Sequence, residues 1–315
     1  MNKAVPVLRD LCLKAQELYE ELDKKKDFEF NFKKEGLFVL YNTEHGEDDE
    51  VRVAEIGNKI GIKAEVKNAD EIMAMEPNLK LSARGGVFYP DDAHITPHLF
   101  SESMVNYLKK NGVTILDNTE VTSIESNGRG VRRIKTSAGD FKAKEYVVTG
   151  GSWSVPLLRT AGINLLMQAG KGYSISMKNP DAQLKYPYIL NEARVAITPM
   201  KGFLRFAGTM EMAGIDLSIN QRRVNAIARN VPKYFANFNV ADTTNNEIWG
   251  GLRPCTPDGM PYIGRFKEYH NLSIVAGHAM VGITLATVSG QLMAQVLGSQ
   301  KTEIDMELLK PDRFN

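Results

Sequence analysis

The chain has 315 residues, with 39 lysines and arginines against 38 aspartates and glutamates, and 43% of its residues are hydrophobic. This composition excludes a disordered chain, and the near balance of charge argues against a nucleic-acid-binding surface. The two cysteines, Cys12 and Cys255, lie far apart, which excludes a disulfide framework and a cysteine-based zinc site. At roughly 150 residues per domain, the length predicts about two domains.

Neither of the two apolar segments predicts insertion into a membrane. The most apolar stretch, Leu272 to Val288, is interrupted by glycine, serine, threonine and histidine, and falls short of the roughly 20 apolar residues of a spanning helix. At the N-terminus, charged residues break any signal-peptide core, and apolar residues recur at helical spacing from Val5 to Leu22. We therefore expect a buried C-terminal segment and an amphipathic N-terminal helix.

The residues up to position 83 predict compact α+β structure after this helix. Short apolar or alternating runs bounded by charged turns indicate strands, and a glycine or a proline ends each helical pattern. The expected elements are strands over 28–32 and 36–41, a helix over 47–61, a strand over 63–67 and a short helix from Asn68.

The pattern changes between positions 84 and 164. Pro97 follows a possible N-cap, and Asn111-Gly112 ends an apolar helical face. The strands expected after this helix cover residues 113–116, a three-stranded meander over 121–143, and residues 146–148.

The remaining residues predict antiparallel strands interrupted by one helix, and then a buried strand that leads into a last helix. The strands expected are 173–177, 188–191, 195–198, 203–207, 248–252, 262–263 and 272–276, and the helices are 220–236 and 282–297.

The glycine-rich bend from Gly277 to Thr284 could bind an oxygen of a ligand. It joins the buried strand to the last helix, so free backbone amides and the positive end of the helix dipole would face that oxygen. A tight packing turn explains the two glycines equally well.

A second candidate is Arg253, at the end of an apolar strand in the stretch Gly251 to Gly264. A guanidinium in that position needs a carboxylate partner, which a substrate could supply bidentately. The alternative is a structural pair with an acidic residue, for example Asp258.

Three weaker patterns complete the candidates. A strand enters Gly150-Gly151 before Trp153, where the backbone can approach a ligand closely. His94 and His98 have the i, i+4 spacing of metal ligands, but Pro97 lies between them, so no metal site is expected. Cys255 has no neighbouring group in sequence that would activate it as a nucleophile.

Together these stretches resemble the FAD-dependent D-amino-acid oxidoreductase family, the branch that includes bacterial D-amino-acid dehydrogenase, glycine oxidase and D-amino-acid oxidase. Residues 147–154, the LRP-x-TPDG-x-P-x-IG stretch over 251–264, and residues 277–290 carry the resemblance, which covers nearly the whole chain. It implies a mixed α/β and α+β fold, in which an FAD-binding Rossmann-like domain, incomplete at its first βαβ unit, is interleaved with an antiparallel-sheet substrate domain.

The resemblance also assigns residues. It implies that Arg253 holds the substrate carboxylate, with Tyr173 a weaker substrate-side candidate. The FAD contacts implied are Val121, Gly150, Gly151, Trp153, Gly277, His278, Val281, Gly282, Ile283 and Thr284. The first nucleotide-binding segment of the family carries a GxGxxG turn, and this sequence has none, so the chain is expected to lack that segment.

The implied reaction is oxidation of a D-amino acid by hydride transfer to flavin N5, with hydrolysis of the imine to a 2-oxo acid and ammonia. A glycine, sarcosine or D-proline-type amine oxidase of the same fold, and a flavin-free remnant without catalysis, are the alternatives. The electron acceptor is oxygen or a quinone. The expected location is cytoplasmic, and a quinone acceptor would place the protein at the inner face of the membrane.

The resemblance divides the chain into alternating segments of two domains. The FAD-binding domain is expected to take residues 1–26, 84–164 and 248–315, and the substrate domain residues 27–83 and 165–247.

Overall fold

The structure is a computed structural model that describes residues 3–178, 184–236, 240 and 246–314. Its helices are α1 (Ala4–Asp23), α2 (Glu44–Lys59), α3 (Ala69–Met75), α4 (Pro97–Lys110), α5 (Ser154–Arg159), α6 (Gln221–Asn230) and α7 (Ala286–Leu297). Short 3-10 helices are η1 (Gly151–Trp153), η2 (Val231–Lys233), η3 (Ala279–Val281) and η4 (Glu307–Leu309).

The strands of the structure form three sheets. In chain order they are β1 (Leu37–Tyr41), β2 (Glu65–Asn68), β3 (Gly85–Tyr89), β4 (Val121–Ser126), β5 (Val131–Thr136), β6 (Gly139–Phe141), β7 (Tyr146–Val148), β8 (Gln168–Lys178), β9 (Tyr188–Leu190), β10 (Val195–Met200), β11 (Phe203–Glu211), β12 (Glu247–Cys255), β13 (Tyr262–Arg265) and β14 (Leu272–Ala276).

The largest sheet has the order β12-β8-β11-β10-β9-β1-β3-β2. Its pairs are antiparallel except for β1 with β9. Helix α6 covers one face, where Val224 and Ile227 join the apolar side chains of β8, β10 and β11 in a buried core. The long strands β8, β11 and β12 therefore have one face buried against a helix and one face available for a site.

Strand β8 shows why the two faces differ. Successive side chains of a strand point to opposite faces, so one face receives Lys171, Tyr173 and Ile175 and the other receives Gly170, Gly172 and Ser174. The first set packs beneath α6 or pairs there with acidic residues. The second set leaves a floor of small residues on the opposite face.

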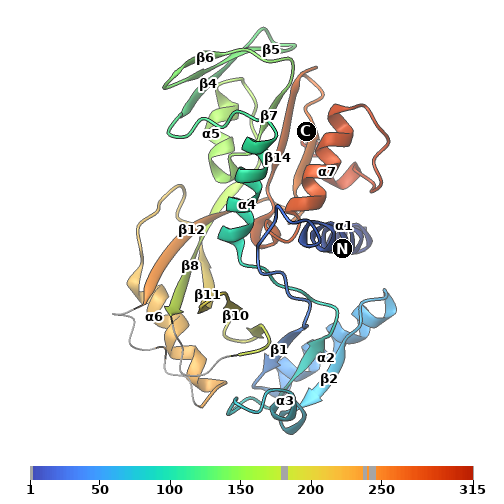
Figure 1. The fold of residues 1–315 in the computed structure, drawn as a ribbon, viewed down its shortest axis with the longest axis vertical. Coiled ribbons are helices and arrows are strands. Elements are labelled where there is room, and N and C mark those ends of the chain that lie inside the picture. The colour runs from blue at the N-terminus through green and yellow to red at the C-terminus, as the bar shows by residue number, and fades with distance from the viewer. Residues whose placement is uncertain (1–2, 179–183, 237–239, 241–245, 315) are drawn as a thin grey trace.

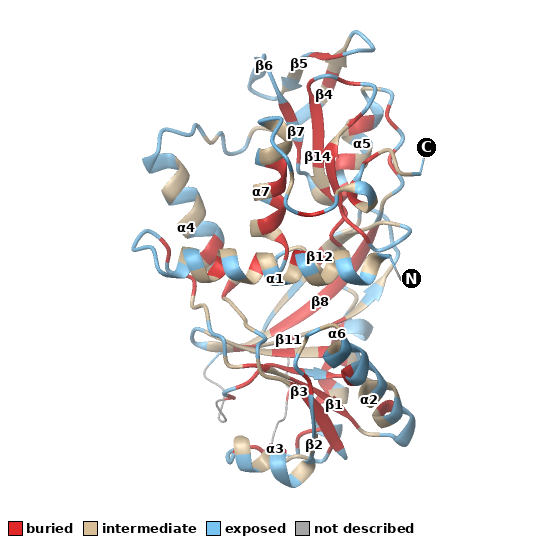
Figure 2. Ribbon diagram, turned by 90° about the vertical axis from the view of Figure 1, so that its right-hand side faces the viewer, coloured by how far each residue is buried: buried red, intermediate tan, exposed pale blue. Residues whose placement is uncertain are grey.

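The rest of the chain surrounds two small sheets, β13-β14-β7 and β4-β5-β6. Helices α1 and α7 pack together against this part, and their apolar faces share a buried core that includes Leu11, Ala15 and Val288. Helix α1 lies at mid-height, below α7 in Figure 1, and in Figure 2 it runs across the middle of the molecule between β14 and β8. Buried residues concentrate along β14 and α7 on one side of it and along β8, β1 and β3 on the other (Figure 2).

The structure confirms the mixed α/β fold and corrects several predicted elements. Residues 28–32 are not a strand, because Phe28 and Phe30 pack against Tyr19, Phe100 and Tyr107. Residues 113–116 pair with no strand in the part of the chain that the structure describes, and the last helix begins at Ala286 rather than at position 282.

Strand pairing in the large sheet crosses two of the predicted domain boundaries. Strand β3 pairs with β1 and β2, and β12 pairs with β8 along its whole length, so both belong to the large sheet. The division at 83 and 247 stays a prediction, and the large sheet takes strands from segments assigned to both domains. These pairs join strands that are distant in sequence, so the local sequence pattern does not predict which strands pair.

Candidate active site

Three of the predicted passages meet at the C-terminal end of β12. The 3-10 helices η1 and η3 both lie against β12, and Cys255 forms an isolated bridge with His278. Three segments therefore come together here: Gly150 to Trp153, the bend after β14, and the strand that carries Arg253. The first and the last of them are about 100 residues apart in the sequence. A single site at this junction stays a prediction, and the three segments are adjacent there.

Arg253 projects over the floor of small residues. It pairs with Gly170 across β8 and β12, and a Cβ on Gly172 would lie 1.5 Å from its Nη1 atom, so only a glycine leaves room for the guanidinium there. Nη1 donates a hydrogen bond to the carbonyl of Thr209 at 3.2 Å. Thr209 has a φ of 57°, at an irregularity in the pairing of β11 with β8, and this backbone turn directs its carbonyl at Arg253.

Arg253 has no acidic partner in the part of the chain that the structure describes. Asp258, the structural partner considered from sequence, instead binds Arg313 through two contacts of 2.8 Å. The guanidinium of Arg253 is half-buried, and this burial lowers its pKa. A buried cation without a counter-ion is costly, so the site suits an anionic ligand.

Tyr173 does not share this site. It lies on the α6 face of β8, is almost fully buried in the core there, and its hydroxyl donates to Glu211 at 2.5 Å. Because its neighbour Gly172 faces Arg253, the alternation of the strand turns Tyr173 away. The prediction of a substrate-side hydroxyl is therefore not supported.

The glycine turn after β7 presents free polar groups. Gly151 has a φ of 52° and open space where a Cβ would be, and Trp153 is exposed. The hydroxyl oxygens of Ser152 and Ser154 are buried and find no hydrogen-bond partner among the described residues. Unsatisfied buried hydroxyls indicate that a polar ligand or ordered water belongs beside them.

The bend after β14 divides into an inward and an outward part. His278 is buried and hydrogen-bonds through Nε2 with Ser289 at 2.9 Å, and Val281 packs against the α1–α7 core. Burial lowers the pKa of His278 to about 4, so its ring is neutral. These two side chains support the turn and do not project toward a ligand.

Ile283 and Thr284 form the outward part. Both are exposed, and neither amide donates to another group within the described ranges. They lie just before α7, where the helix dipole favours an electronegative atom. Gly277 has a φ of 83°, and Gly282 sits at the end of η3, so the glycines shape the turn that exposes these amides.

Val121 lies further along the small-sheet part. It is the first residue of β4, is exposed, and pairs with Thr136 of β5. Strand β4 packs against α5, the helix that follows η1. This places Val121 one element away from the glycine turn.

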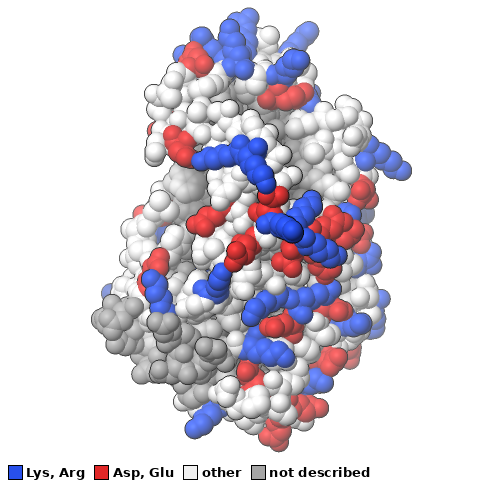
Figure 3. Space-filling view, in the orientation of Figure 1, with Lys and Arg blue, Asp and Glu red and all other residues white. Residues whose placement is uncertain are grey.

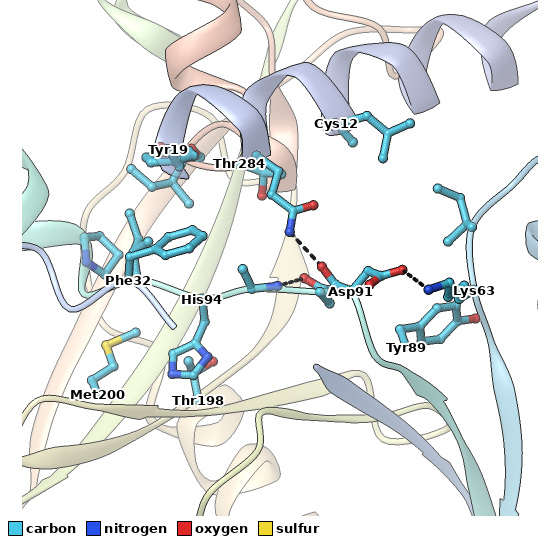
Figure 4. Close-up of a pocket in the computed structure, with 18 of the residues that line it drawn as sticks. Cys12, Tyr19, Phe32, Lys63, Tyr89, Asp91, His94, Thr198, Met200 and Thr284 are labelled. Carbon is cyan, nitrogen blue, oxygen red and sulfur yellow. Dashed lines mark hydrogen bonds and ion pairs between the residues drawn. The ribbon is translucent and has the colours of Figure 1, made fainter. Parts of the chain in front are cut away.

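A cavity of about 470 Å³ opens beside the outward part of the bend. Its lining includes Tyr19 and Cys12 of α1, Thr284, and Thr198 of β10 (Figure 4). The hydroxyl of Tyr19 donates to the carbonyl of Ile283 at 2.5 Å, which fixes the bend to α1. Gln16 of the same helix donates to the carbonyl of Asp91 at 2.7 Å on the opposite wall.

Two cavity residues were not expected at the site: His94, which was considered only as a metal ligand, and Arg205. His94 points toward Thr198 in Figure 4, and both of its ring nitrogens are buried. Burial, and then the charge of Lys33, lower the pKa of His94. The second is Arg205 of β11, which pairs with Thr198 and so reaches the cavity from the sheet. The alternation of side chains between the two faces of β11 is the one sequence signal that could have predicted the position of Arg205.

Many charged side chains of the described residues pair with a side chain of opposite sign. On the face in Figure 3, acidic and basic side chains are interspersed over the middle of the molecule. Ion pairs such as Arg84 with Glu47 and Arg133 with Glu125 account for many of them. Within the described residues, no three histidine, cysteine or acidic side chains group to hold a metal ion, and no helix has the length and hydropathy to cross a membrane.

Comparison with known proteins identifies the family. The family model described as "FAD dependent oxidoreductase" matches residues 3–296. The chain belongs to this family. It is 31% identical over 294 residues to a D-amino acid dehydrogenase of Vibrio vulnificus (strain YJ016), a match that covers 92% of this chain and 70% of the relative. It is 29% identical over 305 residues to a D-amino acid dehydrogenase of Bradyrhizobium diazoefficiens, covering 95% and 72%.

Solved structures of a glycine oxidase and an L-proline dehydrogenase have a similar fold. The glycine oxidase of Geobacillus kaustophilus superimposes with a TM-score of 0.86 at 25% identity, covering 98% of this chain and 82% of the other. The L-proline dehydrogenase of P. horikoshii gives 0.84 at 22% identity, covering 96% and 82%. The second likeness concerns the fold alone.

The residues at the junction fit one part of the family's cofactor, FAD. The free amides of Ile283 and Thr284, the unpaired hydroxyls of Ser152 and Ser154, and the open turn at Gly151 suit the polar edge of a flavin ring. For the pyrophosphate, the sequence offers no strand, GxGxxG turn and helix. The fit therefore covers the flavin ring and not the dinucleotide end.

Proposed function

We propose that this oxidoreductase oxidises a D-amino acid to an imine, which water hydrolyses to a 2-oxo acid and ammonia. The observation that carries the proposal is the half-buried Arg253, which has no acidic partner among the described residues and lies where the two glycine bends meet. The relatives named D-amino acid dehydrogenase support the same substrate class. When bound, FAD supplies the acceptor for the hydride that leaves the substrate Cα.

The side chains have separate parts in this proposal. Arg253 binds the substrate carboxylate, the Thr209 carbonyl holds the guanidinium in place, and Gly172 leaves the space that it occupies. The amides of Ile283 and Thr284 would face the electronegative edge of the flavin. An amino acid that enters with a neutral amine requires no strong general base, and positioning then contributes most of the catalysis.

The visible absorption spectrum of the purified 315-residue chain tests the proposal, before and after addition of FAD and then of D-alanine. A bound-flavin spectrum that bleaches with D-alanine is expected, and a chain that takes up no FAD would contradict the proposal for this chain. Bleaching by glycine, sarcosine or D-proline in preference to D-alanine would assign the chain to the amine-oxidase alternative.

Arg253→Met tests the role of the carboxylate. It should lower kcat/KM by about 100-fold, which is about 3 kcal/mol, the value of a bidentate charged contact. Arg52→Met is the matched control, because Arg52 is an exposed residue of α2 that pairs with Asp49. An equal loss in both variants would argue against a specific role.

The electron acceptor and the location remain proposals of the same kind. We propose a cytoplasmic protein that passes electrons to oxygen or to a membrane quinone, in the second case as a peripheral protein at the inner face. Oxygen consumption during turnover supports the first acceptor. Turnover with a soluble quinone, together with sedimentation on lipid vesicles, supports the second.

A further inference from the structure

Arg205 lies on the same sheet face as Arg253. Its register partners are Thr198 on β10 and Ser176 on β8, and Ser176 is in the same alternate set as Gly170, opposite Arg253. Both guanidinium groups therefore extend over the floor of small residues. The two arginines come from strands β11 and β12, which flank β8 on either side.

Trp249 separates the two arginines. The Arg205 guanidinium carbon is 5.6 Å from the centroid of the Trp249 ring, a cation–π contact that limits its movement. The same ring lies over Gly251, where a Cβ would be 2.0 Å from it, while Arg253 lies over Gly172. Two cations thus lie on one face of the sheet, and in register the row of Trp249 is between their rows.

Neither cation is neutralised by the described residues. Arg205 makes no ion pair among the described residues. Glu247 pairs with the same residue of β8, Ser176, from the other side, and it forms no ion pair with Arg205. Burial, and then the charge of Arg253, lower the pKa of Arg205. Two like charges held near each other and away from full hydration favour a ligand that carries two negative groups.

We propose that the preferred substrate is a dicarboxylic amino acid, whose α-carboxylate binds Arg253 and whose second carboxylate binds Arg205. The chemical class is that of aspartate and glutamate in the D configuration. This inference rests on the proposed function for the assignment of Arg253. Arg205 then determines specificity, because a substrate with one carboxylate leaves it unpaired.

Binding of non-oxidisable acids tests the pair without turnover. Isothermal titration of the 315-residue chain with glutarate and with valerate compares two five-carbon acids that differ by one carboxylate. Glutarate should bind at least about tenfold more tightly, the difference expected for one charge-assisted contact. Equal affinity, or no glutarate binding at millimolar concentration, would overturn the proposal.

Variants locate the second carboxylate. Arg205→Gln should lower glutarate affinity by about tenfold and leave valerate affinity within about twofold, and Arg205→Lys should recover part of the loss. Arg52→Gln serves as the control for loss of a surface charge, and circular dichroism confirms folding. If Arg205→Gln weakens both acids by the same factor, the two arginines share one carboxylate and the proposal fails.

Turnover separates this inference from the proposed function. If D-alanine bleaches the flavin but D-glutamate and D-aspartate show no advantage in kcat/KM, the function stands and the dicarboxylate preference is wrong. If no amino acid bleaches the flavin but glutarate binding depends on Arg205, the proposed function is wrong and the paired site for a dicarboxylate stands.

Discussion

The guanidinium of Arg253 occupies the space that a side chain at position 172 would fill. A Cβ on Gly172 would lie 1.5 Å from Nη1 and 2.2 Å from Cζ of Arg253. Since these atoms are the far end of a flexible side chain, a larger residue at 172 would displace the guanidinium without disturbing the backbone of the sheet. The position of the Arg253 guanidinium therefore depends on a glycine at position 172.

Gly172→Ala should weaken carboxylate binding while the fold stays intact. We expect at least about a tenfold loss of valerate affinity, from the displaced charged contact, and a change in unfolding free energy below about 1 kcal/mol. Gly290→Ala is the control, because Gly290 lies in α7 with open space around it and should gain up to about 1 kcal/mol. Calorimetry measures both quantities, and unchanged affinity in Gly172→Ala would contradict the geometry.

Asp258→Asn should destabilise the protein without changing the anion site. Asp258 and Met260 hold Arg313, whose side chain is 8% exposed, so loss of the carboxylate leaves a buried cation. We expect a cost of about 3 kcal/mol in urea unfolding. If Asp258 were instead the counter-ion of Arg253, the variant would bind carboxylates more tightly.

Thr209→Gly should stabilise the fold. Thr209 is a β-branched residue at φ 57°, and its hydroxyl is buried without a partner among the described groups. Glycine relieves both costs and keeps the carbonyl that holds Arg253, so the expected gain in unfolding free energy is about 1 kcal/mol. Thr122→Gly, at an exposed position of β4 with no positive φ, should lose about as much. A loss of stability in Thr209→Gly would show that the strain is not real.

His278 should make stability depend on pH. Because burial lowers its pKa from 6.5 to about 4, the unfolded chain binds the proton more readily between these values. The free energy of unfolding should thus have its full value above pH 6.5. It should fall by up to about 1.4 kcal/mol per pH unit as the pH drops toward 4. His278→Gln should lose this part of the slope, whereas His45→Gln, at an exposed position of α2, should retain it. Equal slopes in the two variants would contradict the assignment.

The sequence by itself determined the local features of this protein. Turn glycines, helix caps and the alternation of strands depend on neighbouring residues, so α4 and β14 were predicted almost at their observed bounds. The same local chemistry pointed to Arg253 and to the glycine bends. Their assignment to a family required no tertiary contact, because the motifs are contiguous in the chain.

Only the tertiary structure decided which side chains meet. Arg205 lies 48 positions before Arg253, and the pairing of β11 and β12 with β8 puts them on one face. The same alternation sends Tyr173 into the core, and packing against Ser289 turns His278 inward. Contacts of this kind depend on strand register and on helix packing between distant segments, because the energy of a side chain is set by the neighbours that the fold brings to it.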